Sequence, residues 1–143
     1  MKKILWIVLS LLLVTACGNG GQKKVQPTSE ATETKMEDAN TVYVYYFHGK
    51  QRCMTCNAVE KVVKEAIEAN YASNAKVKFM PLSTDDKANE ALVEKYEISW
   101  NGLIIDKGGN NSINITEQAF ANAVNNPDVL IELLKSEVAD RLN

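Results

Sequence analysis

The chain has 143 residues, of which 45% are hydrophobic and 24% charged, and its formal net charge at pH 7 is −2. This composition is ordinary for a globular protein with one hydrophobic core, and it lacks the basic excess that would favour nucleic acid as a partner. The three cysteines are too few for the disulfide framework of a small secreted scaffold.

Residues 1–16 have the pattern of a secretory signal peptide. A positive stretch at Lys2 and Lys3 precedes an apolar run from Ile4 to Val14, interrupted only by Ser10. A run of about 11 residues is too short for a comfortable membrane span, but it suits a signal sequence. We therefore expect the rest of the chain to be exported into an oxidising compartment.

The end of this run, Val14-Thr15-Ala16-Cys17, resembles a bacterial lipobox. The resemblance implies cleavage before Cys17, lipidation of that cysteine and a protein anchored in a membrane of the bacterial cell envelope, facing an extracytoplasmic compartment. The open alternative is a soluble secreted protein in which Cys17 is incidental. Residues 17–40 would form a flexible tether, because they contain almost no apolar side chains that could order them.

The first predicted strand is Thr41–Phe47, which is rich in β-branched and aromatic residues. Residues 57–70 predict an amphipathic helix. Its apolar stripe consists of Val59, Val62, Val63, Ala66 and Ile67. Residues 76–82 predict a second strand, in which Pro81 marks the strand end or an edge position.

A second helix is expected to follow residues 83–86, which supply an N-cap and an acidic first turn, and to end near Tyr96. Its apolar side would consist of Ala88, Ala91, Leu92 and Tyr96. Further along, Leu103–Ile105 and Ser112–Ile115 flank a glycine-containing turn and predict a β-hairpin.

The C-terminal part is predicted to be helical. Thr116 is expected to cap this region, and the last helix is expected to begin with Asn126 as its cap and Pro127 in its first position. The apolar stripe of that helix consists of Leu130, Leu133, Leu134 and Val138. The complete order, β-α-β-α-β-β-α over residues 41–143, predicts an α/β domain with a mixed four-stranded sheet and helices on both faces.

The most informative motif is Cys53-Met54-Thr55-Cys56, which lies where the first strand leads into the first helix. Two intervening residues allow a disulfide within one turn, and the helix N-terminus, with roughly +0.5 of an elementary charge, favours thiolate over thiol. If Cys17 is lipidated, Cys53 and Cys56 are the only other thiols. They must pair with each other, bind something together or be kept reduced by a partner.

This motif and the element order resemble the thioredoxin-like family over residues 41–142. The resemblance implies a three-layer sandwich and thiol–disulfide exchange through a mixed disulfide, with Cys53 as the exposed attacking thiol and Cys56 as the buried resolving thiol. The partners would be protein thiols or disulfides of the cell envelope. Arg52 and His48 are expected to favour the Cys53 thiolate.

The sequence departs from the family pattern around this motif. Arg52 replaces the usual tryptophan, and Met54-Thr55 separates the cysteines, so the redox potential of the family does not carry over. The family usually has a substrate-positioning cis-proline before the third strand, whereas this chain has Trp100 and then Asn101 nearest the proline position. Trp100 and Asn101 are nevertheless the candidates for substrate contact.

Two functions of different classes remain open. The first is a membrane-tethered thiol–disulfide oxidoreductase. The second is a binding protein of the same fold whose cysteines are not catalytic, and which either carries a metal such as zinc or copper at Cys53 and Cys56 or docks to a membrane system. Together with His48, the two thiolates would supply three ligands that these metals accept, although no fourth is evident. An inert structural disulfide is the third interpretation of the pair, and no other cofactor is expected.

Overall fold

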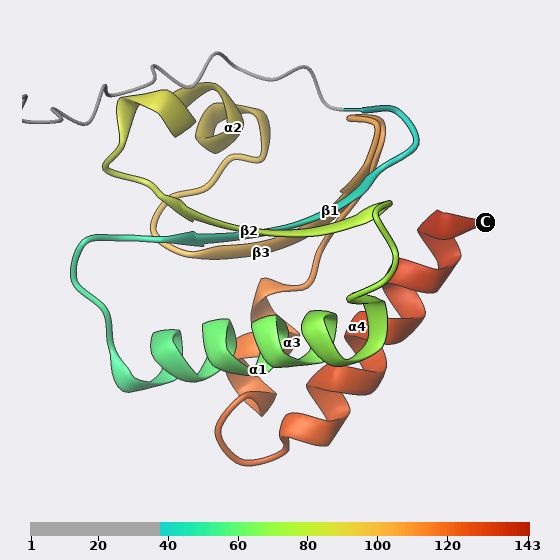
Figure 1. The fold of residues 1–143 in the computed structure, drawn as a ribbon. Helices are drawn as coiled ribbons and strands as arrows, with labels where there is room; N and C mark the ends of the chain where they lie inside the picture. The colour runs from blue at the N-terminus through green and yellow to red at the C-terminus, as the bar shows by residue number, and fades with distance from the viewer. Residues whose placement is uncertain (1–37) are drawn as a thin grey trace, which may run out of the picture. The chain divides into compact units, whose positions relative to one another are not determined.

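The computed structural model describes residues 38–143. The predicted signal peptide at 1–16, the expected lipidation of Cys17 and residues 18–37 of the predicted tether lie outside the described residues. The described part of the chain forms an α/β domain in which a four-stranded sheet is packed between helices (Figure 1).

The four strands form one mixed sheet. They are β1 (Val42–His48), β2 (Val77–Ser83), β3 (Gly102–Lys107) and β4 (Asn111–Asn114). The strand order is β2-β1-β3-β4, with β1 parallel to β2 and antiparallel to β3, and with β3 antiparallel to β4. The predicted mixed sheet and hairpin are therefore confirmed. Pro81 lies in the edge strand β2, where a missing N–H donor is tolerated.

Three helices cover one face of the sheet, namely α1 (Met54–Tyr71), α3 (Thr116–Asn122) and α4 (Pro127–Leu142) (Figure 1). We call this the α1 face. The core on this face is mainly aliphatic and includes the predicted stripes of α1 and α4, with Val62 and Leu133 partly buried at its margin. Its largest fully buried side chains are Val42, Val44, Tyr46, Val59, Val63, Leu103, Ile105, Ile115, Leu130 and Leu134.

The opposite face, which we call the α2 face, is covered by the 3₁₀ helix η1 (Lys87–Asn89) and the short helix α2 (Glu90–Lys95) (Figure 1). Its core is smaller and more aromatic. The buried residues Tyr45, Phe47, Leu82 and Ile104 pack with the partly buried residues Tyr43, Leu92, Val93, Tyr96 and Ile98. Helices therefore cover both faces of the sheet, as predicted.

The predicted apolar side of the second helix is partly wrong. Ala88 and Ala91 are exposed, whereas Val93 and Ile98 pack against the sheet with Leu92 and Tyr96. The first turn is a 3₁₀ turn with about three residues per turn, so the side that faces the sheet is displaced from the pattern of a continuous α-helix.

The predicted capping role of Thr116 is also wrong. Helix α3 has no side-chain cap, and the Thr116 hydroxyl instead accepts a hydrogen bond from Leu103 N at 2.8 Å, which ties α3 to the start of β3. By contrast, α4 begins as predicted, with Asn126 at the N-cap position and Pro127 in the first turn.

Candidate functional site

The loop between β1 and α1 carries the cysteine motif and is anchored near its start. Lys50 N donates a hydrogen bond to Asp85 Oδ2 at 2.7 Å, and Thr84 N donates to the His48 carbonyl oxygen at 2.9 Å. Both partners belong to the segment that follows β2. The loop therefore enters α1 from a defined position at the C-terminal end of β1.

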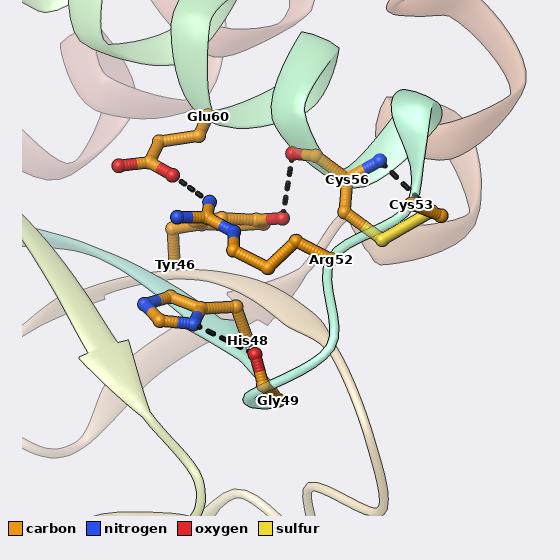
Figure 2. Close-up of a disulfide and its surroundings, with 7 residues drawn as sticks. All are labelled: Tyr46, His48, Gly49, Arg52, Cys53, Cys56 and Glu60. Atoms are coloured by element: carbon orange, nitrogen blue, oxygen red, sulfur yellow. Dashed lines mark hydrogen bonds and ion pairs between the residues drawn. A yellow bond between two sulfur atoms is a disulfide. The ribbon is translucent and has the colours of Figure 1, made fainter.

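Cys53 and Cys56 form a disulfide, with their Cα atoms 5.1 Å apart (Figure 2). Cys53 is the N-cap residue of α1, and its Sγ accepts a hydrogen bond from Cys56 N at 3.1 Å. The side chain of Cys53 is exposed, whereas Cys56 is only 3% exposed. A reactant arriving from solvent therefore meets Cys53 first.

The helix end also sets the electrostatics of this disulfide. The first turn of α1 contains no acidic residue, so no carboxylate in that turn opposes the positive end of the helix dipole. A thiolate at Cys53 would receive the hydrogen bond from Cys56 N that the disulfide sulfur receives now, and such bonds are stronger to a charged acceptor. The position favours a thiolate at Cys53.

Tyr46 connects β1 with the first turn of α1. Its side chain is fully buried on the α1 face, and its hydroxyl donates a hydrogen bond to the Cys56 carbonyl oxygen at 2.7 Å (Figure 2). Burial raises the pKa of the Tyr46 hydroxyl, while a hydrogen bond from Arg52 and the charge of that residue act in the opposite direction. Because the net shift is upward, Tyr46 is a neutral donor near neutral pH.

Arg52 lies next to Cys53 in the chain, but its side chain runs along Tyr46 toward α1 (Figure 2). The guanidinium carbon is 5.8 Å from the centroid of the Tyr46 ring, and the guanidinium forms an ion pair with Glu60. The two side chains of this pair are 28% and 25% exposed, so the pair is partly shielded from solvent. The positive charge of Arg52, which was expected to act on Cys53, is therefore partly compensated by the Glu60 carboxylate.

His48 lies beside Tyr46. Its Nδ1 is 3.1 Å from the Gly49 carbonyl oxygen, and its ring centroid is 5.9 Å from that of Tyr46 (Figure 2). Within residues 38–143, no three His, Cys, Asp or Glu side chains are arranged to hold a metal ion. The three-ligand set of Cys53, Cys56 and His48 that the sequence offered to zinc or copper is thus not assembled in this part of the chain.

Trp100 and Asn101 lie at the same end of the sheet as the cysteine loop, because Gly102 pairs with Phe47 near the end of β1. Trp100 is 79% exposed. Both residues border an open hollow of about 360 Å³, together with Ile98 and Phe120. All peptide bonds in residues 38–143 are trans, so this segment has no counterpart of the cis-proline.

The segment before Trp100 is held by an unusual helix end. Ile98 N donates to the Val93 carbonyl oxygen at 2.9 Å, and Glu97 N donates to that of Glu94 at 3.1 Å. This is the Schellman pattern, which normally has glycine in its left-handed position. Here Glu97 occupies that position with φ of 54°, and a side chain there is strained.

Two residues of the site, Tyr46 and Glu60, were not predicted as site residues. Strand alternation could have placed Tyr46 on the same face as Val44, and the i,i+4 spacing could have placed Glu60 one turn beyond Cys56. Neither pattern indicates that the Arg52 side chain joins the two. The contact becomes visible only when β1 and α1 are packed together.

The chain matches none of the protein-family profiles and none of the curated proteins with which it was compared. Among residues 38–143, no helix combines the length and the apolar character needed to cross a membrane. The geometry around Cys53 and Cys56 is therefore the basis on which a function can be argued.

Proposed function

We propose that this protein is a membrane-tethered thiol–disulfide oxidoreductase with a thioredoxin-like fold, and that it acts on proteins of the cell envelope. The observation that carries the proposal is a disulfide at the N-terminus of α1 with one exposed and one buried cysteine. The strand order β2-β1-β3-β4, with helices on both faces, is compatible with the thioredoxin-like fold.

The proposed reaction begins when a partner thiolate attacks Sγ of Cys53. The Cys53–Cys56 bond breaks, the Cys56 sulfur leaves with the electron pair and takes up a proton, and a mixed disulfide joins the partner to Cys53. A second partner thiolate then attacks the partner's own sulfur and releases Cys53. Two electrons pass from the partner dithiol to this protein, and the reverse sequence reduces a partner disulfide.

The exposure of the two sulfurs determines the order of these steps. Cys53 is accessible to a partner, whereas Cys56 is buried against the core. In the second step Cys53 is the leaving group, and a better-stabilised thiolate leaves faster. The helix N-terminus and the Cys56 N–H group both stabilise that thiolate.

The cellular part of the proposal depends on the N-terminal sequence. Lipidation of Cys17 would anchor the domain, and the 20 residues from Gly18 to Glu37, acting as a flexible coil, would reach roughly 22–27 Å. This reach would hold the domain away from the membrane surface. Partners would then be envelope proteins with accessible cysteines.

Trapping of the mixed disulfide tests the proposal. In cells that naturally produce the protein, Cys56→Ser leaves Cys53 able to attack a partner disulfide but removes the thiol that would resolve the resulting mixed disulfide, so we expect higher-mass adducts that a reductant collapses. The matched control is Cys53→Ser, which makes the same substitution at the sulfur that joins the partner and should give no adducts. If Cys56→Ser gives no adducts, or if both variants give the same ones, the proposal fails.

The non-catalytic alternative makes a different prediction for the same variants. Stoichiometric binding of zinc or copper by the reduced chain, lost in Cys53→Ser, combined with an absence of adducts from Cys56→Ser, would identify a binding protein instead. The metal titration is therefore run on the variants used for trapping.

A further inference from the structure

The charge nearest to Cys53 in the chain is that of Arg52. Arg52 immediately precedes Cys53, yet its guanidinium is paired with Glu60, which lies one helical turn after Cys56 (Figure 2). The disulfide carries no charge on sulfur, so its sulfur atoms do not compete with Glu60 for Arg52 in the oxidised protein. After reduction, a thiolate at Cys53 would compete with Glu60 for the same cation.

We propose that Glu60 is a positioning residue which, by holding Arg52, limits the stabilisation of negative charge at Cys53 and so makes the cysteine pair less oxidising. This inference rests on the proposed thiol–disulfide exchange and adds one residue to it. Glu60 does not touch a sulfur atom in this role. It acts by setting the location and the net charge of the Arg52 side chain.

The surroundings of Arg52 give its side chain a defined path. Tyr46 is fully buried, and its hydroxyl is fixed to the Cys56 carbonyl oxygen at 2.7 Å, so the ring forms an immobile surface against the core. The guanidinium lies 5.8 Å from the centroid of this ring and ends at Glu60 on α1. Arg52 is therefore held between a fixed ring and a helical carboxylate.

The ion pair between Arg52 and Glu60 is partly buried, so its charges act over a longer distance than those of an exposed pair. With the side chains 28% and 25% exposed, solvent and salt screen their charges less than those of a fully exposed pair. Replacement of Glu60 by the isosteric glutamine would leave the Arg52 charge uncompensated on the residue next to Cys53 in the chain. A nearby opposite charge favours the charged form of a titrating group.

Other titratable groups surround the same loop and would be unchanged by this substitution. From β1 these are Tyr46 and His48, and from the segment after β2 it is Asp85, which accepts the hydrogen bond from Lys50 N. Further along α1, Lys61 pairs with Glu65, and Lys64 pairs with Glu68. Because these groups are common to the parent and the variant, a difference between the two reports on Glu60.

The effect has a redox consequence that can be written with balanced atoms and electrons. The protein disulfide and two glutathione thiols yield the protein dithiol and one glutathione disulfide, with two electrons passing to the protein. A more stable thiolate at Cys53 favours the dithiol side of this equilibrium. In Glu60→Gln, the equilibrium constant should therefore shift toward reduced protein.

The test compares Glu60→Gln with its parent in the full-length chain, in a Cys17→Ser background that leaves Cys53 and Cys56 as the only thiols. The reduced proteins are alkylated with iodoacetamide over a range of pH, and mass spectrometry follows modification of Cys53. We expect the pH midpoint of alkylation to fall by about half a unit or more in Glu60→Gln, because the opposing carboxylate is gone. In Arg52→Gln it should rise.

The matched control is Glu65→Gln, which removes the same charge from the same helix at a side chain that is 65% exposed and paired with Lys61. Its midpoint should equal that of the parent. The double variant Arg52→Gln/Glu60→Gln should have the same midpoint as Arg52→Gln, because a side chain at position 60 has no influence when there is no cation to hold. This comparison stands even if Glu60→Gln alone folds poorly.

The inference is overturned if Glu60→Gln has the same midpoint as Glu65→Gln or a higher one. Its failure can be told apart from failure of the proposed function, because alkylation requires no redox partner. If the parent does not exchange with glutathione, the proposed function fails. If the parent exchanges but Glu60→Gln shifts neither the midpoint nor the equilibrium constant, only the role of Glu60 is lost.

Discussion

The two faces of the sheet are packed differently. The α1 face is covered by three helices over a large, mainly aliphatic core, and it supports the disulfide at the start of α1. The α2 face is covered by one 3₁₀ turn and a six-residue helix, over a small cluster rich in aromatic rings. The disulfide therefore lies on the more extensively packed side of the domain.

The α2 face also buries a charged group. Asp106 is fully buried, and its Oδ2 accepts hydrogen bonds from the Tyr96 hydroxyl and from Gly109 N, both at 2.9 Å. Lys95 Nζ is 3.7 Å from the same oxygen. Among the described residues, Asp106 Oδ1 has no hydrogen-bond partner. The α2 face thus buries a carboxyl group that is held by polar contacts from α2 and the turn after β3.

The contrast places the disulfide on a helix that packs against the larger of the two cores. Thiol exchange requires reacting groups held in a reproducible geometry, which a packed helix provides better than a loop. The exposed Trp100 follows the strained end of α2 and borders a hollow together with Ile98 and Phe120.

Leu134→Ala should cause the largest loss of stability. Leu134 is fully buried in the aliphatic core, and its truncation should lower the free energy of unfolding by about 2–5 kcal/mol through lost burial and a residual cavity. The control is the neighbouring Leu133→Ala, which should cost less because Leu133 is only partly buried. Equal losses in chemical denaturation would contradict the assigned core of the α1 face.

Tyr96→Phe tests the polar support of the α2 face. The substitution removes a hydroxyl that donates to the buried Asp106 carboxylate, so unfolding should become easier by about 1–3 kcal/mol. Tyr43→Phe is the matched control, because the Tyr43 hydroxyl accepts only an exposed hydrogen bond from Asp38 N. The control should remain within about 0.5 kcal/mol of the parent. A comparable loss in both variants would show that Asp106 does not depend on Tyr96.

Tyr46→Phe tests the link between β1 and the first turn of α1. Loss of the hydrogen bond to the Cys56 carbonyl oxygen should lower the free energy of unfolding by about 0.5–1.5 kcal/mol, the usual net contribution of such a bond. The measurement is denaturant unfolding of the oxidised protein at neutral pH. A variant as stable as the parent would contradict this role of Tyr46.

The same variant makes a prediction about pH. Because the folded state raises the pKa of Tyr46 above its ordinary value of 10.0, folding favours the protonated hydroxyl. The resulting stabilisation is fully present below pH 10.0 and is lost as the pH rises through the higher pKa of the folded state. The stability of the parent should therefore decline in this alkaline range, and Tyr46→Phe should decline less. Parallel alkaline curves would contradict the assignment.

Glu97→Gly should have the smallest effect and the opposite sign. Glycine fits the left-handed position at the end of α2 without a side-chain penalty, so the free energy of unfolding should increase by about 0.5–1 kcal/mol despite the greater freedom of glycine in the unfolded chain. Thermal unfolding measures the change. A destabilised variant would show that the Glu97 side chain makes a favourable contribution larger than the strain.

Much of the fold could be predicted because its patterns are local. The β-branched run of β1, the helical stripes of α1 and α4 and the edge proline Pro81 each reflect a property of one segment. The side of the second helix that faces the sheet could not be predicted correctly, because its 3₁₀ start changes the rotation per residue. The role of Thr116 was predicted wrongly because its hydroxyl accepts a hydrogen bond from Leu103 of β3, a residue that is distant in the sequence.

The candidate site was predictable only in part for the same reason. The motif itself gives Cys53 and Cys56, and its position gives the helix N-terminus. The Arg52–Glu60 pair and the Tyr46 hydrogen bond depend on how α1 lies on β1, which no local pattern specifies. The roles of His48, Trp100 and Asn101 in reactivity or partner contact stay predictions.

The most direct test of the central proposal is equilibration of the full-length chain with glutathione buffers of increasing reducing strength. An exchange protein should convert reversibly between the Cys53–Cys56 disulfide and the dithiol, with a two-electron midpoint between about −120 and −270 mV, the range of characterised exchange proteins. An inert structural disulfide would instead remain oxidised throughout, with a midpoint below about −300 mV. That result would contradict thiol–disulfide exchange as the function of this protein.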